Sequence, residues 1–277
     1  MKAPAFDYVR PRSLAEAVAL LGKGDGEARV VAGGQSLLAL MNLRLSAPAL
    51  LIDIARLPEL AVVSQDDDAV TLGAGVTHAM IEDARVPDPS RGLMARAAAS
   101  LGYRAIRNRG TIGGSLALAD PAAEWPAVLA ALDAEAAVCG SSGRRRLGCV
   151  GFATGIYETR LADDEIVETV RLPKLSAAAR WGYVKLARKS GEFANALAVA
   201  VVDQARGHCR VVIGAANGAP LVLAQASRAL ADGKHAAETM HAAIAADLDR
   251  AADRHFDDFQ RNLHRVAAMR AVQQVTA

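Results

Sequence analysis

Hydrophobic positions recur with helical spacing in some stretches of the chain and form short continuous runs in others. Residues 13–21 (SLAEAVALL) have helical spacing behind Ser13, and Glu16 stands three positions later, which predicts a helix with a capping box. The valine-rich run at residues 28–32 predicts a buried strand, residues 37–45 predict a second helix, and residues 49–54 predict the next strand. This part of the chain is therefore expected to run strand, glycine turn, helix, strand.

The middle of the chain mixes helical and strand-like stretches. Residues 93–106 have helical spacing, and another helix follows further on, entered either through Asp120-Pro121 or at Pro126. The sequence leaves both starts open. Two runs that flank Ser141-Ser142-Gly143 predict a hairpin, and residues 165–172 (EIVETVRL) predict a strand that Pro173 ends.

The composition changes near residues 174–179. Beyond this point lie three strand-like runs, at residues 181–186, 195–203 and 209–215, and then two alanine-rich helical stretches, at residues 224–230 and 236–272. The second stretch is long enough that we expect it to break into more than one helix. Strands followed by helices predict an α+β domain, so we place a domain boundary near residue 177.

Two glycine pairs stand out at the starts of predicted helices. Gly33-Gly34 follows the first buried strand, and Gly113-Gly114 lies in a closely similar string: GGQSLLAL against IGGSLALA. Glycine pairs allow positive φ and bring backbone N–H groups close to a ligand, and a following helix favours a phosphate. Neither segment fits G-x-G-x-x-G or the P-loop pattern. A phosphate-bearing ligand and a pair of ordinary turns both stay open on this reasoning.

Bulk composition excludes several classes of protein. The chain has 277 residues and a net charge of +2, too near neutral for a nucleic-acid or membrane-surface binder. The start lacks the apolar core of a secretory signal, and no apolar run is long enough to cross a bilayer, so we expect a cytoplasmic protein. The three cysteines and six histidines lack metal-ligand spacing.

Longer strings resemble a known family. AGGQSL at residues 32–37 and RNRGTIGGSLALADPAAEWPAVL at residues 107–129 resemble the FAD-binding subunit of molybdenum hydroxylases, a family that includes the medium subunit of carbon monoxide dehydrogenase and the flavin domain of xanthine dehydrogenase. FDYVRPRSLAEAVALL and GIYETRLADDEIVETVRLP match the family pattern as well. The resemblance covers Phe6 to about Gly214, and the tail fits the family's C-terminal domain more loosely.

The resemblance implies an α+β fold in two domains. Residues 1–176 are expected to form a two-part FAD-binding domain of the PCMH/vanillyl-alcohol-oxidase-like type, with subdomains at about residues 1–55 and 56–176. Residues 177–277 are expected to form a small α+β C-terminal domain with a three-stranded antiparallel sheet and helices.

The resemblance also implies a set of cofactor-binding residues. Each lies in one of the two glycine segments or at a position that the family places near the cofactor. They are Val31, Ala32, Gly33, Gly34, Gln35, Ser36, Leu37, Leu101, Gly110, Thr111, Ile112, Gly113, Gly114, Ser115, Asp120, Glu124, Val167 and Lys185. Considered alone, Lys185 is more simply a solvated strand lysine. The chain departs from frequent family residues at Gln35, Ser115, Leu118 and Phe193. It also lacks the cysteine-rich insertion that carries a [4Fe–4S] cluster in some relatives.

The implied function is electron transfer through non-covalently bound FAD. A large molybdopterin-binding subunit would hydroxylate the substrate, and a small subunit with two [2Fe–2S] clusters would relay electrons to this chain, which passes them to a final acceptor. A dimer of heterotrimers is the expected assembly. No catalytic residue and no metal ligand is expected here, because the redox chemistry belongs to the cofactor. A stand-alone flavin oxidoreductase and a flavin-free assembly subunit are the alternatives.

Two groups of side chains outside this set have simpler interpretations. His78, near a predicted helix start, is interpreted as structural, although covalent flavin attachment through it stays open. The arginines at positions 104, 107, 109 and 144–146 are most simply solvated surface charges, with phosphate binding or partner docking as the other interpretation.

Overall fold

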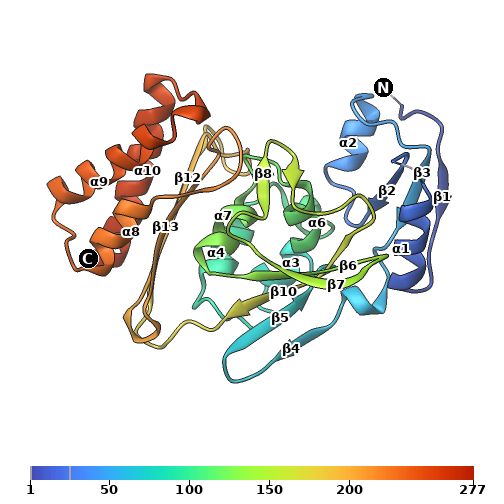
Figure 1. Cartoon of the computed structure of the whole chain (residues 1–277), viewed down its shortest axis with the longest axis horizontal. Helices are drawn as coiled ribbons and strands as arrows, with labels where there is room; N and C mark the ends of the chain where they lie inside the picture. The colour runs from blue at the N-terminus through green and yellow to red at the C-terminus, as the bar shows by residue number, and fades with distance from the viewer. Residues whose placement is uncertain (1, 25) are drawn as a thin grey trace.

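The N-terminal lobe is a small parallel sheet between two helices. The structure is a computed structural model that describes residues 2–24 and 26–277. Strands β1 (Asp7–Val9), β3 (Leu50–Asp53) and β2 (Ala28–Val31) lie in that spatial order, and all pairs are parallel. Helix α1 (Leu14–Lys23) packs in the main core with Ile52, whereas Met41 of α2 (Leu37–Asn42) packs with Val31 and Leu51 on the opposite face (Figure 1).

Two details of this lobe differ from the sequence-based expectation. The Ser13 hydroxyl accepts the Glu16 N–H at 3.2 Å, but the Glu16 carboxylate accepts the N–H of Arg12 at 2.7 Å, so the predicted capping box is only half formed. Helix α2 ends at Asn42 because Arg44 has a φ of 59° and the Leu45 N–H returns to the Leu40 carbonyl. The predicted end at residue 45 is therefore wrong.

The middle of the chain forms an antiparallel sheet of five strands with helices on one face. The spatial order is β4 (Val63–Gln65), β5 (Ala69–Gly73), β10 (Ile166–Pro173), β6 (Glu135–Gly140) and β7 (Gly143–Gly148). The helices are α3 (His78–Glu82), α4 (Leu93–Ala99), α5 (Arg104–Arg107), α6 (Ile112–Leu118) and α7 (Glu124–Ala131), with a short 3-10 turn η1 at Pro58–Leu60. A two-stranded ribbon, β8 (Ala153–Gly155) and β9 (Glu158–Thr159), lies beside α6.

The hairpin and the β10 strand are confirmed, but the single helix predicted at residues 93–106 is wrong. It is two helices, α4 and α5, because Gly102 between them has a φ of 43°. Helix α7 begins at Glu124, between the two starts that the sequence left open.

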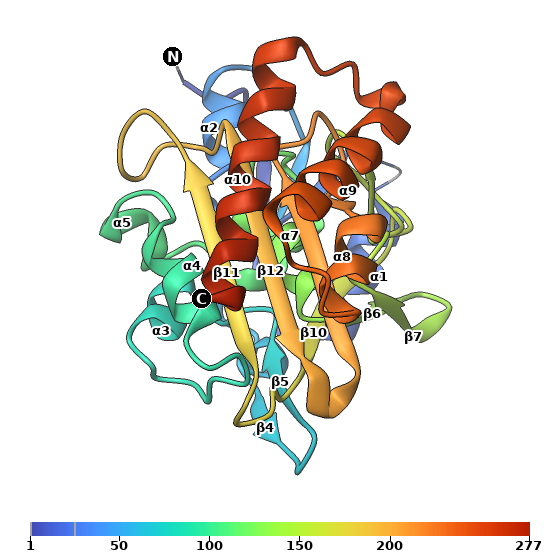
Figure 2. The same cartoon turned by 90° about the vertical axis from the view of Figure 1, so that its left-hand side faces the viewer.

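The C-terminal part is a twisted antiparallel sheet covered by helices. Strands β11 (Arg180–Leu186), β12 (Ala196–Asp203), β13 (His208–Gly214) and β14 (Leu221–Val222) follow in order, with a 3-10 turn η2 at Gln204–Arg206. Helices α8 (Ala224–Ala231), α9 (Ala237–Arg250) and α10 (Asp258–Thr276), with η3 at Ala252–Arg254, cover its outer face (Figure 2). The three predicted strands and the break in the long helical stretch are confirmed, and β14 is a fourth strand.

Strand β12 joins the two larger cores. Leu197, Val199 and Val201 pack in the same core as α7, whereas Ala198 and Ala200 face α8 to α10. Because β12 contributes to both cores, the cores do not mark a division between two domains, and the boundary near residue 177 stays a prediction.

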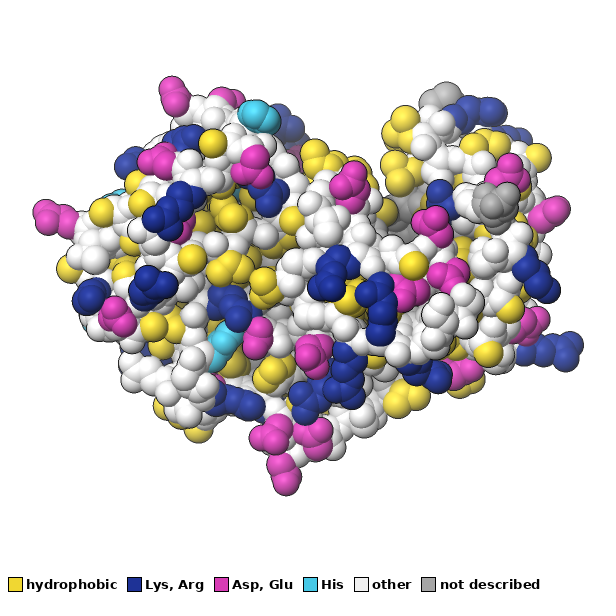
Figure 3. Space-filling view, viewed as in Figure 1, with side chains coloured by type: hydrophobic (Ala, Val, Ile, Leu, Met, Phe, Trp, Pro, Cys, Tyr) yellow, Lys and Arg dark blue, Asp and Glu magenta, His cyan; other side chains and the backbone are white. Residues whose placement is uncertain are grey.

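Among the residues described, no helix combines the length and apolarity needed to cross a membrane. A notch, with hydrophobic side chains on both walls, separates the N-terminal lobe from the middle of the molecule (Figure 3).

Candidate functional site

The first glycine segment (residues 31–37) touches the second (residues 109–115), although about 75 residues separate them in the sequence. Gly33 follows β2 and lies against the backbone of Arg109 and Gly110, just before α6: a Cβ at Gly33 would be 2.7 Å from the Arg109 carbonyl carbon and 2.8 Å from the Gly110 Cα. Gly33 lies in the turn between β2 and α2, and Arg109 and Gly110 lie in the short segment between α5 and α6. Glycine is thus required at Gly33 by close approach of two backbones.

The first glycine segment presents a row of free backbone donors. Gly34 has a φ of 72°, as predicted for a left-handed turn. Within the described parts of the chain, no acceptor is found for the N–H groups of Gly33, Gly34, Gln35 and Ser36. The Gln35 amide folds back and donates to the Gly33 carbonyl at 3.1 Å. Successive free N–H groups in such a turn form an anion-binding concavity.

The second segment is built differently. Gly113 and Gly114 lie in the first turn of α6 and do not have positive φ, so the expected left-handed turn is wrong at this pair. The N–H groups of Ile112 and Gly113 donate to the carbonyls of Val76 and Ala74, each at 3.0 Å, and the Gly114 N–H donates to the Thr111 hydroxyl at 3.0 Å.

Close packing explains the first glycine of this second pair. A Cβ at Gly113 would lie 2.8 Å from the Ala74 Cα, whereas one at Gly114 would meet only the Thr111 hydroxyl, also at 2.8 Å. Gly114 is exposed and Ser115 is half-buried next to it. This segment therefore presents an open surface and the half-buried Ser115 rather than a row of free amides.

Glu124 and Lys185 form a buried ion pair. The Lys185 Nζ lies 2.6 Å from the Glu124 Oε1, and the side chains are only 8% and 2% exposed, respectively. Lys185 also donates to the Ser100 carbonyl at 2.9 Å. Burial raises the pKa of the Glu124 carboxyl, and the charge of Lys185 lowers it again in part. Lys185 is thus not the solvated strand lysine that its sequence position alone suggests.

This ion pair connects three elements. Glu124 is in the first turn of α7, Ser100 caps the end of α4, and Lys185 belongs to β11, so each charge lies at the helix end whose dipole favours it. The Tyr183 hydroxyl lies 2.8 Å from the Ser100 hydroxyl, and burial raises the pKa of this tyrosine. The sequence did not single out Ser100, because it contacts Lys185 through a backbone carbonyl, which any residue carries. It did not single out Tyr183 either, because its contact with Ser100 spans 83 positions of the chain.

Asp120 has a neighbour that the sequence did not single out. Its Oδ1 accepts the Ala122 N–H at 2.9 Å, and its Oδ2 accepts the Tyr157 hydroxyl at 3.2 Å. Tyr157 projects from the turn between β8 and β9 and is 54% exposed. Tyr157 belongs to the string GIYETRL that matches the family pattern, but it lies 37 positions after Asp120, so the sequence gave no indication of the contact.

The remaining predicted positions lie in other surroundings. Leu101 is half-buried and forms a bridge with Gly191, and Val167 is 4% exposed in the main core, just before a bulge in β10. Among the positions that depart from the family pattern, Phe193 is 64% exposed and Leu118 is half-buried.

His78 has a structural environment. Its Nδ1 accepts the Trp125 indole N–H at 3.0 Å, and burial lowers its pKa to about 4. Gly110 packs on the ring so closely that a Cβ there would lie 2.7 Å from the Nε2. The interpretation of His78 as structural is therefore supported. No cluster of three or more metal-ligating side chains is found in the described residues.

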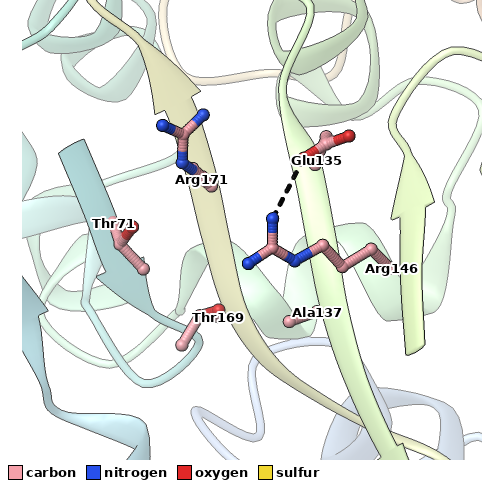
Figure 4. Close-up of a pocket in the computed structure, with 6 residues that line it drawn as sticks. All are labelled: Thr71, Glu135, Ala137, Arg146, Thr169 and Arg171. Carbon is pink, nitrogen blue, oxygen red and sulfur yellow. Dashed lines mark ion pairs between the residues drawn. The ribbon is translucent and has the colours of Figure 1, made fainter. Parts of the chain in front are cut away.

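A small pocket lies on the outer face of the five-stranded sheet. Figure 4 shows its lining, Thr71, Glu135, Ala137, Arg146, Thr169 and Arg171, with Arg146 3.9 Å from Glu135. Its volume is about 60 Å³, far below the roughly 300 Å³ at which ligand pockets begin. These residues alternate along their strands with buried ones such as Val70 and Val170, so the pocket faces away from α6 and α7 and from the glycine segments.

Comparisons with known proteins identify relatives along most of the chain. The family described as "FAD binding domain in molybdopterin dehydrogenase" matches residues 4–175. The carbon monoxide dehydrogenase medium chain of Hydrogenophaga pseudoflava is 38% identical, over 79% of this chain and 77% of the relative. The nicotine 6-hydroxylase medium subunit of Paenarthrobacter nicotinovorans is 39% identical, over 79% of this chain and 77% of the relative.

Solved structures match over nearly the whole chain. A structure of carbon monoxide dehydrogenase from Hydrogenophaga pseudoflava has a TM-score of 0.89 at 32% identity, covering 99% of this chain and 98% of the other. Quinoline 2-oxidoreductase from Pseudomonas putida 86 has a TM-score of 0.83 at 31% identity, with the same coverage. The match therefore includes the C-terminal sheet and helices as well as the glycine segments.

Proposed function

The chain belongs to the FAD-binding medium subunits of the molybdenum hydroxylase family of oxidoreductases, and we propose that it binds one FAD non-covalently between α2 and α6 and uses it to transfer electrons. They would arrive from the [2Fe–2S] clusters of a small partner subunit and leave to a final acceptor. A large subunit would hold molybdopterin and select the substrate. The relatives are named as a medium chain and a medium subunit, which supports a complex in which separate subunits carry the separate cofactors.

One observation carries the proposal: four adjacent backbone N–H groups, at residues 33–36, have no acceptor among the described residues and lie where the two glycine segments meet. Phosphate oxygens are suitable acceptors for such donors, and each hydrogen bond to a charged group contributes about 1.5–3 kcal/mol. The Ser36 and Ser115 hydroxyls are further donors in the same segments. The donor set therefore fits the diphosphate of a dinucleotide.

When bound, FAD supplies the redox chemistry, and the chain's own residues bind and orient it. The backbone at residues 33–36 would hold the diphosphate, and the second segment would form the opposite wall. The buried pair of Lys185 and Glu124 would fix the relative positions of α4, α7 and β11 beside the cofactor. We assign no acid, base or nucleophile to this chain. We propose a dimer of heterotrimers as the assembly.

Spectroscopy on the purified full chain tests the proposal. We expect a yellow protein with one FAD per chain, released intact by acid precipitation, and rapid reduction of that flavin by the reduced iron–sulfur partner. Oxidation of a substrate without any partner subunit would instead favour a stand-alone flavin oxidoreductase. A colourless chain that does not take up added FAD would favour an assembly subunit and contradict the proposal.

A further inference from the structure

The predicted cofactor-binding residues leave the charge of a diphosphate unbalanced. Each phosphate of FAD is negative, yet the one cation in that set, Lys185, already pairs with Glu124 at 2.6 Å and is almost completely buried. Backbone N–H groups at residues 33–36 supply dipoles but no full positive charge. A further cation near the glycine segments would balance part of that charge.

Three arginines precede α6, and two of them are occupied. Arg104 pairs with Asp83 at 2.6 Å and with Glu82 at 2.8 Å. Arg107 pairs with Glu82 at 2.7 Å and donates to the carbonyls of Leu101 and Gly102, each at 3.0 Å. These contacts hold α5 against α3, so neither guanidinium is free for a phosphate.

Arg109 differs from both. Its side chain is exposed, and it makes no ion pair or side-chain hydrogen bond with any described residue. Its backbone is also the point at which the two glycine segments meet, because a Cβ at Gly33 would lie 2.7 Å from its carbonyl carbon. The free guanidinium and the free N–H groups of the first segment therefore originate from touching parts of the backbone.

We propose that Arg109 is the cation that pairs with the diphosphate of FAD, an inference that rests on the proposed function. A guanidinium presents N–H groups in a fixed planar fork that matches two phosphate oxygens, and such charge-assisted bonds are stronger than neutral ones. The site then combines the dipoles of residues 33–36 on one side with the charge of Arg109 on the other.

The test compares Arg109→Gln and Arg109→Lys with Arg270→Gln, which removes another exposed arginine, on α10. Apo protein of the full chain is titrated with FAD at several salt concentrations. We expect Arg109→Gln to raise the Kd for FAD about tenfold, as for loss of one charge-assisted bond, and to flatten its salt dependence. Arg109→Lys should lie between wild type and Arg109→Gln, and Arg270→Gln should match wild type.

The outcomes separate this inference from the proposed function. If Arg109→Gln binds FAD as wild type does, with the same salt dependence, Arg109 is no ligand, although the flavin function stands. Equal weakening by Arg109→Gln and Arg270→Gln would also overturn the inference, since it would reflect net charge alone. A wild-type chain that fails to bind FAD would overturn the proposed function and this inference with it. Unchanged thermal unfolding of the apo variants confirms that each one folds.

Discussion

Single glycines serve three different purposes in this site. Gly34 is needed for its positive φ, Gly33 and Gly113 for contact with neighbouring backbone, and Gly114 for an open surface at the start of α6. The Gly-Gly pair is thus required for different structural reasons in the two segments. A substitution is expected to affect flavin binding, folding or both according to which of these causes applies.

Valine at Gly114 and at Gly33 should therefore have different effects. At Gly114 a Cβ meets only the Thr111 hydroxyl, so Gly114→Val should lose flavin while its Tm as apo protein changes little. At Gly33 it overlaps the Arg109 backbone, so Gly33→Val should lose flavin and also unfold at lower temperature. Flavin content after gel filtration and the Tm of the apo proteins measure both effects. A yellow Gly114→Val protein would contradict the site.

Two buried histidines should make the fold sensitive to acid. Burial lowers the pKa of His78 and of His264 from 6.5 to about 4. The unfolded chain therefore takes up protons first, and stability that is full above pH 6.5 is lost as the pH falls toward 4. At pH 5 the loss is about 2 kcal/mol for each histidine. Urea unfolding at pH 7 and pH 5 measures it, and His78→Gln should reduce the difference. Equal stability at both pH values would disprove these pKa shifts.

At the scale of elements, the contacts that define the site join parts distant in sequence. The valine-rich strands, the β6–β7 hairpin and the break between α9 and α10 could be predicted, because local periodicity and turn residues determine them. The break between α4 and α5 was missed, since helical spacing in the sequence continues across residues 101–103, where the backbone leaves the helix with a φ of 43° at Gly102 and an extended Tyr103. The identities of Glu124 and Lys185 came from the family resemblance, but their ion pair and the role of Ser100 depend on packing that no local pattern encodes.

Removal of one partner from this buried pair should be costly. Lys185→Met leaves Glu124 buried without its cation and should reduce the free energy of unfolding by about 3–5 kcal/mol at neutral pH. The double variant Glu124→Gln/Lys185→Met should recover part of that loss, since no charge stays buried. Urea unfolding of the two variants measures the difference. If the single variant were as stable as the double, the pair would not connect α4, α7 and β11 as described.

The pH dependence of Lys185→Met adds a second check. Because burial holds the pKa of Glu124 above its ordinary value, the folded chain retains this proton more readily than the unfolded chain. Its contribution to stability is full below the ordinary glutamate pKa and decreases as the pH rises through the raised one. Without the charge of Lys185 the pKa of Glu124 should rise further. The loss in the free energy of unfolding of Lys185→Met, relative to the wild type, should therefore be larger at pH 8 than at pH 5.

At the scale of the whole molecule, the notch between the N-terminal lobe and the middle sheet is the feature that local patterns could not predict. Two contacts between distant parts of the chain belong to this scale: Gly33 meets the backbone of Arg109, and β12 packs between the α7 core and the outer helices. The proposed cofactor would lie beside the first of these contacts, where the two glycine segments meet. The small pocket on the outer sheet face takes no part in this arrangement.

Hydrogen exchange at individual backbone amides tests whether residues 33–36 hold the diphosphate of FAD. Without FAD, the N–H groups of residues 33–36 should exchange rapidly, because no acceptor protects them among the described residues. On addition of FAD they should slow by roughly tenfold or more, the protection expected of hydrogen bonds to phosphate. Ile112, Gly113 and Gly114, whose N–H groups already have acceptors, should change much less. If FAD binds and the amides of residues 33–36 exchange as rapidly as before, the diphosphate lies elsewhere and the proposed site is wrong.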